Sequence, residues 1–222
     1  MPPTSPLHRF HSAPVSCPGC HRVLDGPVDQ CPACGYHAWT CVDHFPYSPP
    51  PLERFVDVED KLSNEDRARL DKAINALENE FAQVRVHVCL VKLLPGTDVS
   101  ECGFWLLNAS IPRDDEAAQR RPWSVLLLVD LTAANASATV GYGLDRFVSD
   151  TQLRAALAAA QSDWESSNFT AGILKFIHQL HAALKVAQKT ASRAARRGQL
   201  PPPLPAARPV PATPPRARHP EV

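Results

Sequence analysis

Four cysteines in the first 34 residues have the spacing that most directly predicts chemistry. The sequence reads Cys17-Pro-Gly-Cys20 and, after ten further residues, Cys31-Pro-Ala-Cys34. Each Cys-x-x-Cys pair can fold into a tight turn that directs both sulfurs toward one ion, and two such pairs complete a tetrahedral shell of thiolates. The spacing therefore predicts a zinc ion bound by Cys17, Cys20, Cys31 and Cys34.

A rubredoxin-like iron centre and a pair of redox disulfides are the competing interpretations of the same motif. Four thiolates leave no coordination position for a catalytic water, so a bound ion is expected to be structural. Gly35 can supply the positive φ that the second turn requires, and a short hairpin with its turn at Asp25-Gly26 is expected between the pairs. Four nearby side chains are expected to be surface or packing residues, with a second, partial metal site as the alternative: His21, His37, Cys41 and His44.

The overall composition predicts a soluble protein without a membrane span. The chain has 222 residues and a formal net charge of zero, which gives no overall field that would attract nucleic acid or an anionic membrane. No apolar run reaches the ~18–20 residues of a membrane helix, and no secretory signal is recognisable. We therefore expect a cytoplasmic protein, in which paired cysteines bind metal more often than they form disulfides.

The 23 prolines cluster near the two ends of the chain and predict its domain organisation. Residues 1–14 are expected to be disordered, residues 15–44 to form the zinc ribbon, and residues 45–52 to form a stiff proline-rich linker. Residues 53–197 are expected to form the globular domain. Residues 198–222 are rich in proline and arginine and are expected to be a disordered tail, with a ligand for a proline-binding domain as the alternative.

Hydrophobic periodicity predicts alternating helices and strands in the globular domain. The first helix is expected to begin at a capping box formed by Ser63 and Asp66. Further helices are expected over residues 98–110, 149–164 and 170–195, strands over 84–92, 123–130 and 136–142, and a polar loop over 113–121. Strands that are buried on both faces and lie between helices predict a three-layer α/β/α sandwich, preceded by the small zinc ribbon.

Three short blocks of the globular domain match the pattern of a known family. They are Phe55-Val-Asp57 with Leu62-Ser63, Val125-Leu-Leu-Leu-Val129, and Gly141-Tyr-Gly-Leu144 with Asp150. In these blocks, residues 53–182 resemble the TPM domain, a family that includes thylakoid lumenal acid phosphatases. The resemblance implies an α/β/α fold, in agreement with the hydrophobic pattern.

The resemblance also implies a cleft lined by acidic residues, which in some members binds calcium or acts on phosphate esters. Asp57 and Asp150 match the early and late aspartates of the family, and Asp145 stands where the family usually has glutamate. The Asp-Arg pair usual in the family would fall near Ala133-Ala134 and is absent, which leaves Asp130 as a candidate replacement. Calcium or magnesium would be the ion of such a cleft. As the alternative, Asp57 and Asp150 favour the starts of the helices that follow them.

These observations lead to three functional hypotheses. The first is a binding, scaffold or accessory protein with an unknown protein partner, because the acidic set of the family is incomplete. The second is a metal-dependent phosphatase acting on phosphate monoesters through Asp57 and Asp150. The third is nucleic-acid binding through the ribbon, which we consider unlikely because Arg22 is the single Lys or Arg between the cysteine pairs. Cys89 and Cys102 are expected to be inert core residues.

Overall fold

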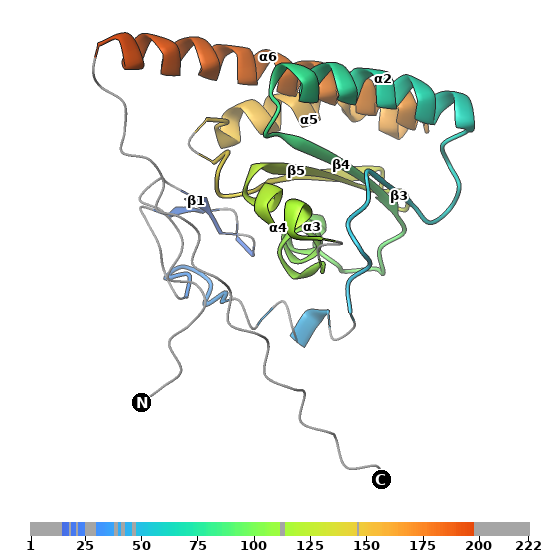
Figure 1. The fold of residues 1–222 in the computed structure, drawn as a ribbon. Helices are drawn as coiled ribbons and strands as arrows, with labels where there is room; N and C mark the ends of the chain where they lie inside the picture. Colours follow the sequence, from blue (N-terminus) through green and yellow to red (C-terminus); the bar gives the residue numbers. More distant parts are fainter. Residues whose placement is uncertain are drawn as a thin grey trace.

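The structure is a computed structural model, in which residues 15–17, 19–20, 22–24, 30–37, 40, 43–45, 48–111, 114–145 and 147–197 are described. The predicted disordered segments, 1–14 and 198–222, and the predicted turn at Asp25-Gly26 lie outside the described residues. A sheet lies between two layers of helices, and the cysteine-containing segment lies beside one of these layers (Figure 1).

The sheet has four strands in the order β3-β4-β5-β6. Strands β3 (Phe55–Asp57), β4 (Arg85–Val91) and β5 (Ser124–Asp130) are parallel, and β6 (Asn135–Val140) runs antiparallel to β5. All seven residues of β5 are buried, as expected of a strand covered on both faces. The predicted strands are confirmed to within two residues. The prediction missed β3, since three residues are too short to show a period of two.

Three helices cover the first face of the sheet: α2 (Asn64–Glu80), α5 (Asp150–Glu165) and α6 (Phe169–Arg196). The predicted capping box of α2 is confirmed, because Ser63 and Asp66 each accept a hydrogen bond from the other's backbone N–H. Apolar side chains on these helices pack against the residues of β4 and β5 that point toward them, such as Leu90 and Leu127. This cluster is the larger part of the core.

The second face is covered by α3 (Val99–Ala109), with α4 (Asp115–Arg120) and the short 3-10 helix η1 (Arg121–Trp123) beside it. The prediction of a polar loop over 113–121 was wrong. Asp114 caps α4 by accepting a hydrogen bond of 2.7 Å from the backbone N–H of Ala117, and six residues show too little periodicity to be recognised. Cys89 and Cys102 are buried between β4 and α3, which confirms that they are core residues. The three-layer α/β/α sandwich is therefore confirmed.

The Gly141-Tyr-Gly block is required by close packing against η1. The backbone N–H of Gly143 donates a hydrogen bond of 2.6 Å to the carbonyl oxygen of Pro122, and a Cβ atom on Gly141 would lie 2.3 Å from the carbonyl oxygen of Arg121. The block does form a tight turn, in which Leu144 N donates to Gly141 O at 2.9 Å. The need for glycine nevertheless comes from space, because neither glycine has a positive φ.

We expect Gly141→Ala to lower the free energy of unfolding by about 1–3 kcal/mol, because the added methyl group must displace backbone atoms of η1. Urea denaturation followed by circular dichroism measures this change. An unchanged unfolding midpoint would contradict the close approach of these two segments.

Candidate metal centre

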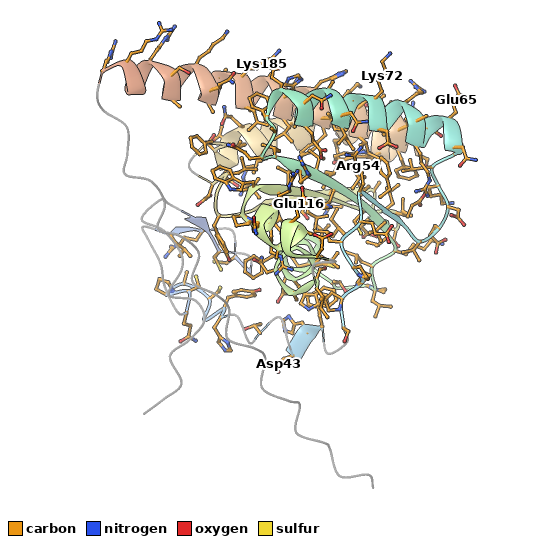
Figure 2. All side chains as sticks on the ribbon, viewed as in Figure 1. Asp43, Arg54, Glu65, Lys72, Glu116 and Lys185 are labelled. Carbon is orange, nitrogen blue, oxygen red and sulfur yellow. The ribbon has the colours of Figure 1, made fainter. Side chains whose placement is uncertain are left out.

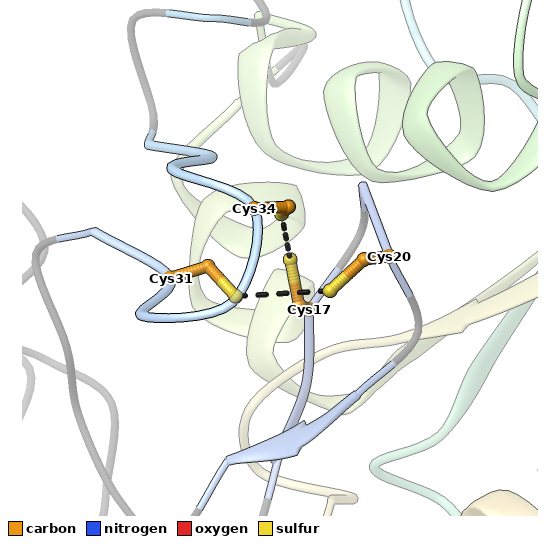
Figure 3. Close-up of side chains that lie close together, drawn as sticks. All are labelled: Cys17, Cys20, Cys31 and Cys34. Carbon is orange, nitrogen blue, oxygen red and sulfur yellow. Dashed lines mark hydrogen bonds between the residues drawn. The ribbon is translucent and has the colours of Figure 1, made fainter.

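The sulfur atoms of the four predicted ligands lie together (Figure 3). The Sγ atoms of Cys17 and Cys34 are 3.7 Å apart, as are those of Cys20 and Cys31, and all four lie within 4.8 Å of one another. A tetrahedral shell with metal–sulfur bonds of about 2.3 Å separates its sulfurs by roughly 3.8 Å. The four cysteines therefore fit a single tetrahedrally coordinated metal ion.

Each Cys-x-x-Cys pair is held by short backbone contacts of its own. Around the first pair, β1 (Val15–Ser16) pairs antiparallel with β2 (Val23–Leu24), and Cys17 N donates to Arg22 O at 2.8 Å. Around the second pair, Gln30 and His37 form a β-bridge, and Gly35 has a φ of 77°. The positive φ predicted for Gly35 is confirmed.

The thiols of the cluster have pKa values that are shifted in opposite directions. A hydrogen bond from the backbone N–H of Ala33 lowers the pKa of Cys31 to about 6, whereas burial raises the pKa of Cys17 to about 12. Four thiolates would therefore not form together at neutral pH without a positive charge among them. A bound cation would supply that charge and displace the remaining protons.

Aromatic contacts join the cysteine-containing segment to α3. The ring of Tyr36, two residues after Cys34, meets the ring of Phe104 edge to face, with centroids 6.5 Å apart. Phe45 stacks on Trp105 at 4.9 Å and is 5% exposed. Tyr36 and Phe45 thus both pack against aromatic side chains of α3.

Polar contacts strengthen the same interface. His44 Nδ1 lies 2.9 Å from a carboxylate oxygen of the buried Glu101, so His44 is engaged by α3 and not by the cysteine cluster. Farther along the predicted linker, Ser110 Oγ donates a hydrogen bond of 3.0 Å to Pro50 O, and Leu52 packs against the α3 cluster. The segment predicted as a stiff linker is therefore in contact with the domain.

The carboxylate of Asp57 is completely enclosed at the carboxyl end of β3. Its side chain is 0% exposed and accepts hydrogen bonds of 2.9 Å from the backbone N–H groups of Lys61 and Leu62 and from the guanidinium of Arg67. These bonds fix the turn that leads into α2. Both oxygens are thus used within the fold.

Asp130, at the carboxyl end of β5, faces the opposite side of the sheet. Asp130 pairs with Val91 of β4, whose side chain packs in the cluster under α3. Asp57 pairs with Leu90 of β4, whose side chain packs in the cluster under α2, α5 and α6. Asp130 Oδ1 accepts hydrogen bonds from the backbone N–H groups of Leu93 (3.2 Å) and Thr132 (2.9 Å). The two carboxylates therefore leave the sheet on different faces.

Asp145 and Asp150 lie beyond the other end of β5. Strand β6 is antiparallel, so its last residue, Val140, pairs with Val125 near the start of β5, and the chain continues from that edge. Asp150 is an exposed first residue of α5 and forms an ion pair of 2.6 Å with Arg154. A seven-residue strand spans about 20 Å, which separates this edge from the carboxyl ends of the parallel strands.

The structure thus does not bring together the four aspartates predicted for an acidic cleft. Among the described residues, the four cysteines form the one group of three or more His, Cys, Asp or Glu side chains whose donor atoms lie close enough for a shared ion. Two of the predicted acids, Asp57 and Asp130, lie at the carboxyl ends of the parallel strands but on opposite faces of the sheet. The other two, Asp145 and Asp150, lie beyond the opposite ends of these strands.

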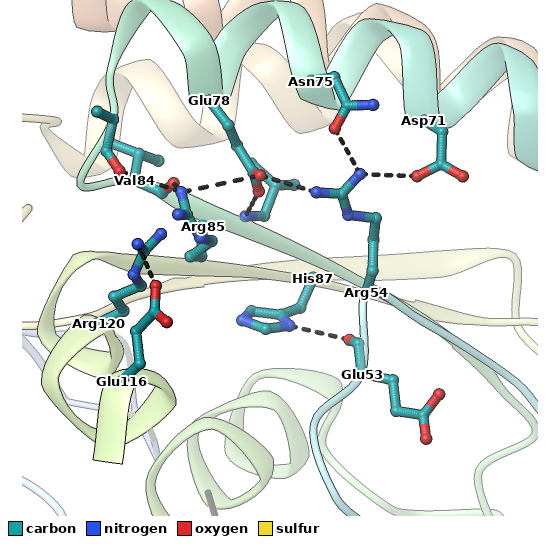
Figure 4. Close-up of polar contacts among 12 residues, drawn as sticks. Glu53, Arg54, Asp71, Asn75, Glu78, Val84, Arg85, His87, Glu116 and Arg120 are labelled. Carbon is teal, nitrogen blue, oxygen red and sulfur yellow. Dashed lines mark hydrogen bonds and ion pairs between the residues drawn. The ribbon is translucent and has the colours of Figure 1, made fainter. Parts of the chain in front are cut away.

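One polar cluster that the sequence analysis missed lies between the start of β3 and α2 (Figure 4). Arg54 donates hydrogen bonds of 2.7–2.8 Å to Asp71, Asn75 and Glu78. The other carboxylate oxygen of Glu78 accepts from the backbone N–H of Val86 at 3.0 Å. The cluster uses Asp71 and Glu78 of α2 to hold the chain where it enters the sheet.

We expect Asp57→Ala to lower the free energy of unfolding by about 3–5 kcal/mol in the absence of any divalent cation, because Arg67 and two backbone N–H groups lose a buried partner. Urea denaturation in the presence of EGTA measures the change. If Asp57 were mainly a cation ligand, its removal would relieve repulsion among carboxylates, and the cation-free variant would be as stable as the parent.

Fold and site together define a three-layer α/β/α domain with a four-cysteine centre packed against one helix layer. Within the described residues, no helix has the length and apolar character needed to cross a membrane. The family model of the TPM domain matches residues 55–183, more than half of the chain. The chain therefore belongs to the TPM domain family.

Several solved structures are similar to this chain at low identity. The BA42 protein of Bizionia argentinensis is 19% identical, with 59% of this chain and 86% of that chain covered and a TM-score of 0.46. The N-terminal domain of cg2496 from Corynebacterium glutamicum is 14% identical (59% and 79% covered, TM-score 0.47). The N-terminal domain of a P. gingivalis protein is 15% identical (67% and 90% covered, TM-score 0.48). No curated protein matches the chain significantly.

Proposed function

We propose that this TPM-domain chain is a binding or scaffold protein whose ribbon is held together by a structural zinc ion. The observation that carries the proposal is the contrast between its two sets of predicted ligands. Four sulfurs converge within 4.8 Å, whereas the four aspartates are distributed over two edges of the sheet. The four sulfurs suit a structural metal ion, whereas Asp57 and Asp130 are used by the fold.

Zinc is the metal that we propose for the cysteine centre. A set of four thiolates in a tetrahedral arrangement selects zinc or iron among the common ions, and zinc accepts this geometry without redox chemistry. The sulfur separations of 3.7 Å are far from the disulfide bond length of about 2.05 Å, and no described cysteine forms a disulfide. We also propose a cytoplasmic location, where paired cysteines bind metal more often than they form disulfides.

Phosphatase activity is the less favoured function. Hydrolysis at an acidic cleft needs a divalent cation held by several hard oxygen ligands. Asp57 has no exposed oxygen, and Asp130 uses its carboxylate to bind two backbone N–H groups. A binding surface for a protein partner places no such demand on these residues.

We expect the purified chain to contain one zinc per molecule, measured by plasma mass spectrometry. Cys31→Ser should remove the metal and lower the thermal midpoint, because the ribbon loses a ligand and the folding free energy that the metal provides. Cys102→Ala is the matched control, since this cysteine lies on the buried side of α3 and outside the cluster, and it should retain the zinc. Stoichiometric iron, or full zinc occupancy in Cys31→Ser, would contradict the assignment.

We further expect no turnover of p-nitrophenyl phosphate that depends on Ca²⁺ or Mg²⁺, and no thermal shift on adding Ca²⁺. The test compares the parent chain with Asp150→Ala, whose exposed carboxylate can be removed at little cost to stability. Cation-dependent turnover that disappears in Asp150→Ala would favour the phosphatase function over the scaffold function.

A further inference from the structure

Helix α6 carries all of its lysine and arginine side chains on one side. It contains five of them and no aspartate or glutamate. At about 100° per residue, the five cations fall within an arc of about 80°. They are Lys175, Lys185, Lys189, Arg193 and Arg196. The apolar side, which includes Phe176 and Leu180, faces the opposite direction and packs against the domain.

The final part of α6 extends beyond the helices that flank it. Helices α2 and α6 run in the same direction, and Glu80, the last residue of α2, contacts His181 at 2.6 Å and Lys185 at 3.3 Å. Beyond Lys185, residues 186–196 continue as helix for about 16 Å. Figure 1 shows this end of α6 passing beyond both α2 and α5. We call residues 186–197 the α6 extension.

Some lysine and arginine side chains of α6 form ion pairs with acidic residues of the domain, and others do not. Lys175 pairs with Asp163 at 2.6 Å and Lys185 with Glu80, so the domain's own acids neutralise the inner positions. The α6 extension adds four exposed cations, and none forms an ion pair with any residue in the described part of the chain: Lys189, Arg193, Arg196 and Arg197. Figure 2 shows nitrogen-tipped side chains projecting from the extension away from the domain, beyond the labelled Lys185.

The remaining residues of the α6 extension restrict the kind of partner it fits. Val186 is its one exposed large hydrophobic side chain, and the positions that continue the apolar side, Ala187 and Ala191, are small. Insertion into a lipid surface requires large apolar side chains, and protein interfaces are usually centred on aromatic or large apolar residues. The extension also contains no aromatic residue on which unpaired bases could stack.

We propose that the α6 extension binds the phosphate backbone of double-stranded DNA without sequence specificity. An α-helix of 10–12 Å diameter fits beside or within a major groove about 12 Å wide, whereas the major groove of A-form RNA is too narrow. Small side chains between the cations allow the helix backbone to approach the duplex. The zero net charge of the chain does not oppose DNA binding by the α6 extension. Salt screens charges that lie more than about 10 Å apart, so the phosphates interact mainly with the cations next to them.

The test is fluorescence anisotropy of a labelled 20-base-pair duplex of arbitrary sequence with the full chain at 50–200 mM salt. Four phosphate contacts predict a plot of log K against log salt with a slope of about −3.6, which is a loss of about 150-fold in affinity across this range. Replacing all four cations of the extension with alanine should abolish this salt-dependent binding. A matched variant removes four exposed cations located elsewhere and should bind like the parent: Lys61, Arg69, Lys92 and Arg154.

A second variant, in which Arg193, Arg196 and Arg197 become lysine, should retain binding, because phosphate contacts require charge and not the shape of the guanidinium. Circular dichroism checks that the variants remain folded. Duplex binding that survives the fourfold alanine change would overturn the proposal and point to the arginines of residues 198–222. Equal or tighter binding of polyglutamate, single-stranded DNA or anionic vesicles would also overturn it.

Discussion

Strand β5 is buried along its whole length, and this burial determines how the rest of the chain is arranged. A strand such as Ser124–Asp130, with every residue buried, must be covered on both faces. Three helices cover one face, whereas α3 covers the other. Tyr36 and Phe45 extend the apolar cluster on the α3 side. The cysteine-containing segment is therefore part of the packing around the sheet, and its four-cysteine cluster is coupled to the fold.

The directions of the strands determine where the four candidate acids lie. Strands β3 and β5 are parallel, so Asp57 and Asp130 both lie at the carboxyl ends of the parallel strands. Strand β6 is antiparallel, so the chain leaves the sheet at the opposite ends of these strands before it reaches Asp145 and Asp150. Each edge thus receives only two of the candidate acids. The TPM fold is kept, and the carboxylates at the ends of its strands serve mainly to fix turns and helix starts.

Local features of the sequence predicted the parts of the structure that depend on local chemistry. The cysteine spacing predicted the cluster of four sulfurs, because each Cys-x-x-Cys turn is local, and the capping box at Ser63 predicted the start of α2. Short elements such as β3 and α4 were missed, since they show too little periodicity. The separation of the aspartates could not be predicted, because it depends on strand direction and on which face each side chain occupies. The cationic arc of α6 follows from the helical period, but its projection depends on where α2 ends and α5 begins.

The coupling between the metal centre and the α3 layer is tested most directly by hydrogen exchange of the backbone amides, with and without a strong chelator. The contacts of Tyr36 with Phe104 and of Phe45 with Trp105 predict that removing the metal increases exchange in α3 while leaving α2, on the other face of the sheet, unchanged. Exchange in α3 that is the same with and without the metal would contradict the account, because the ribbon would then be independent of the domain that it contacts.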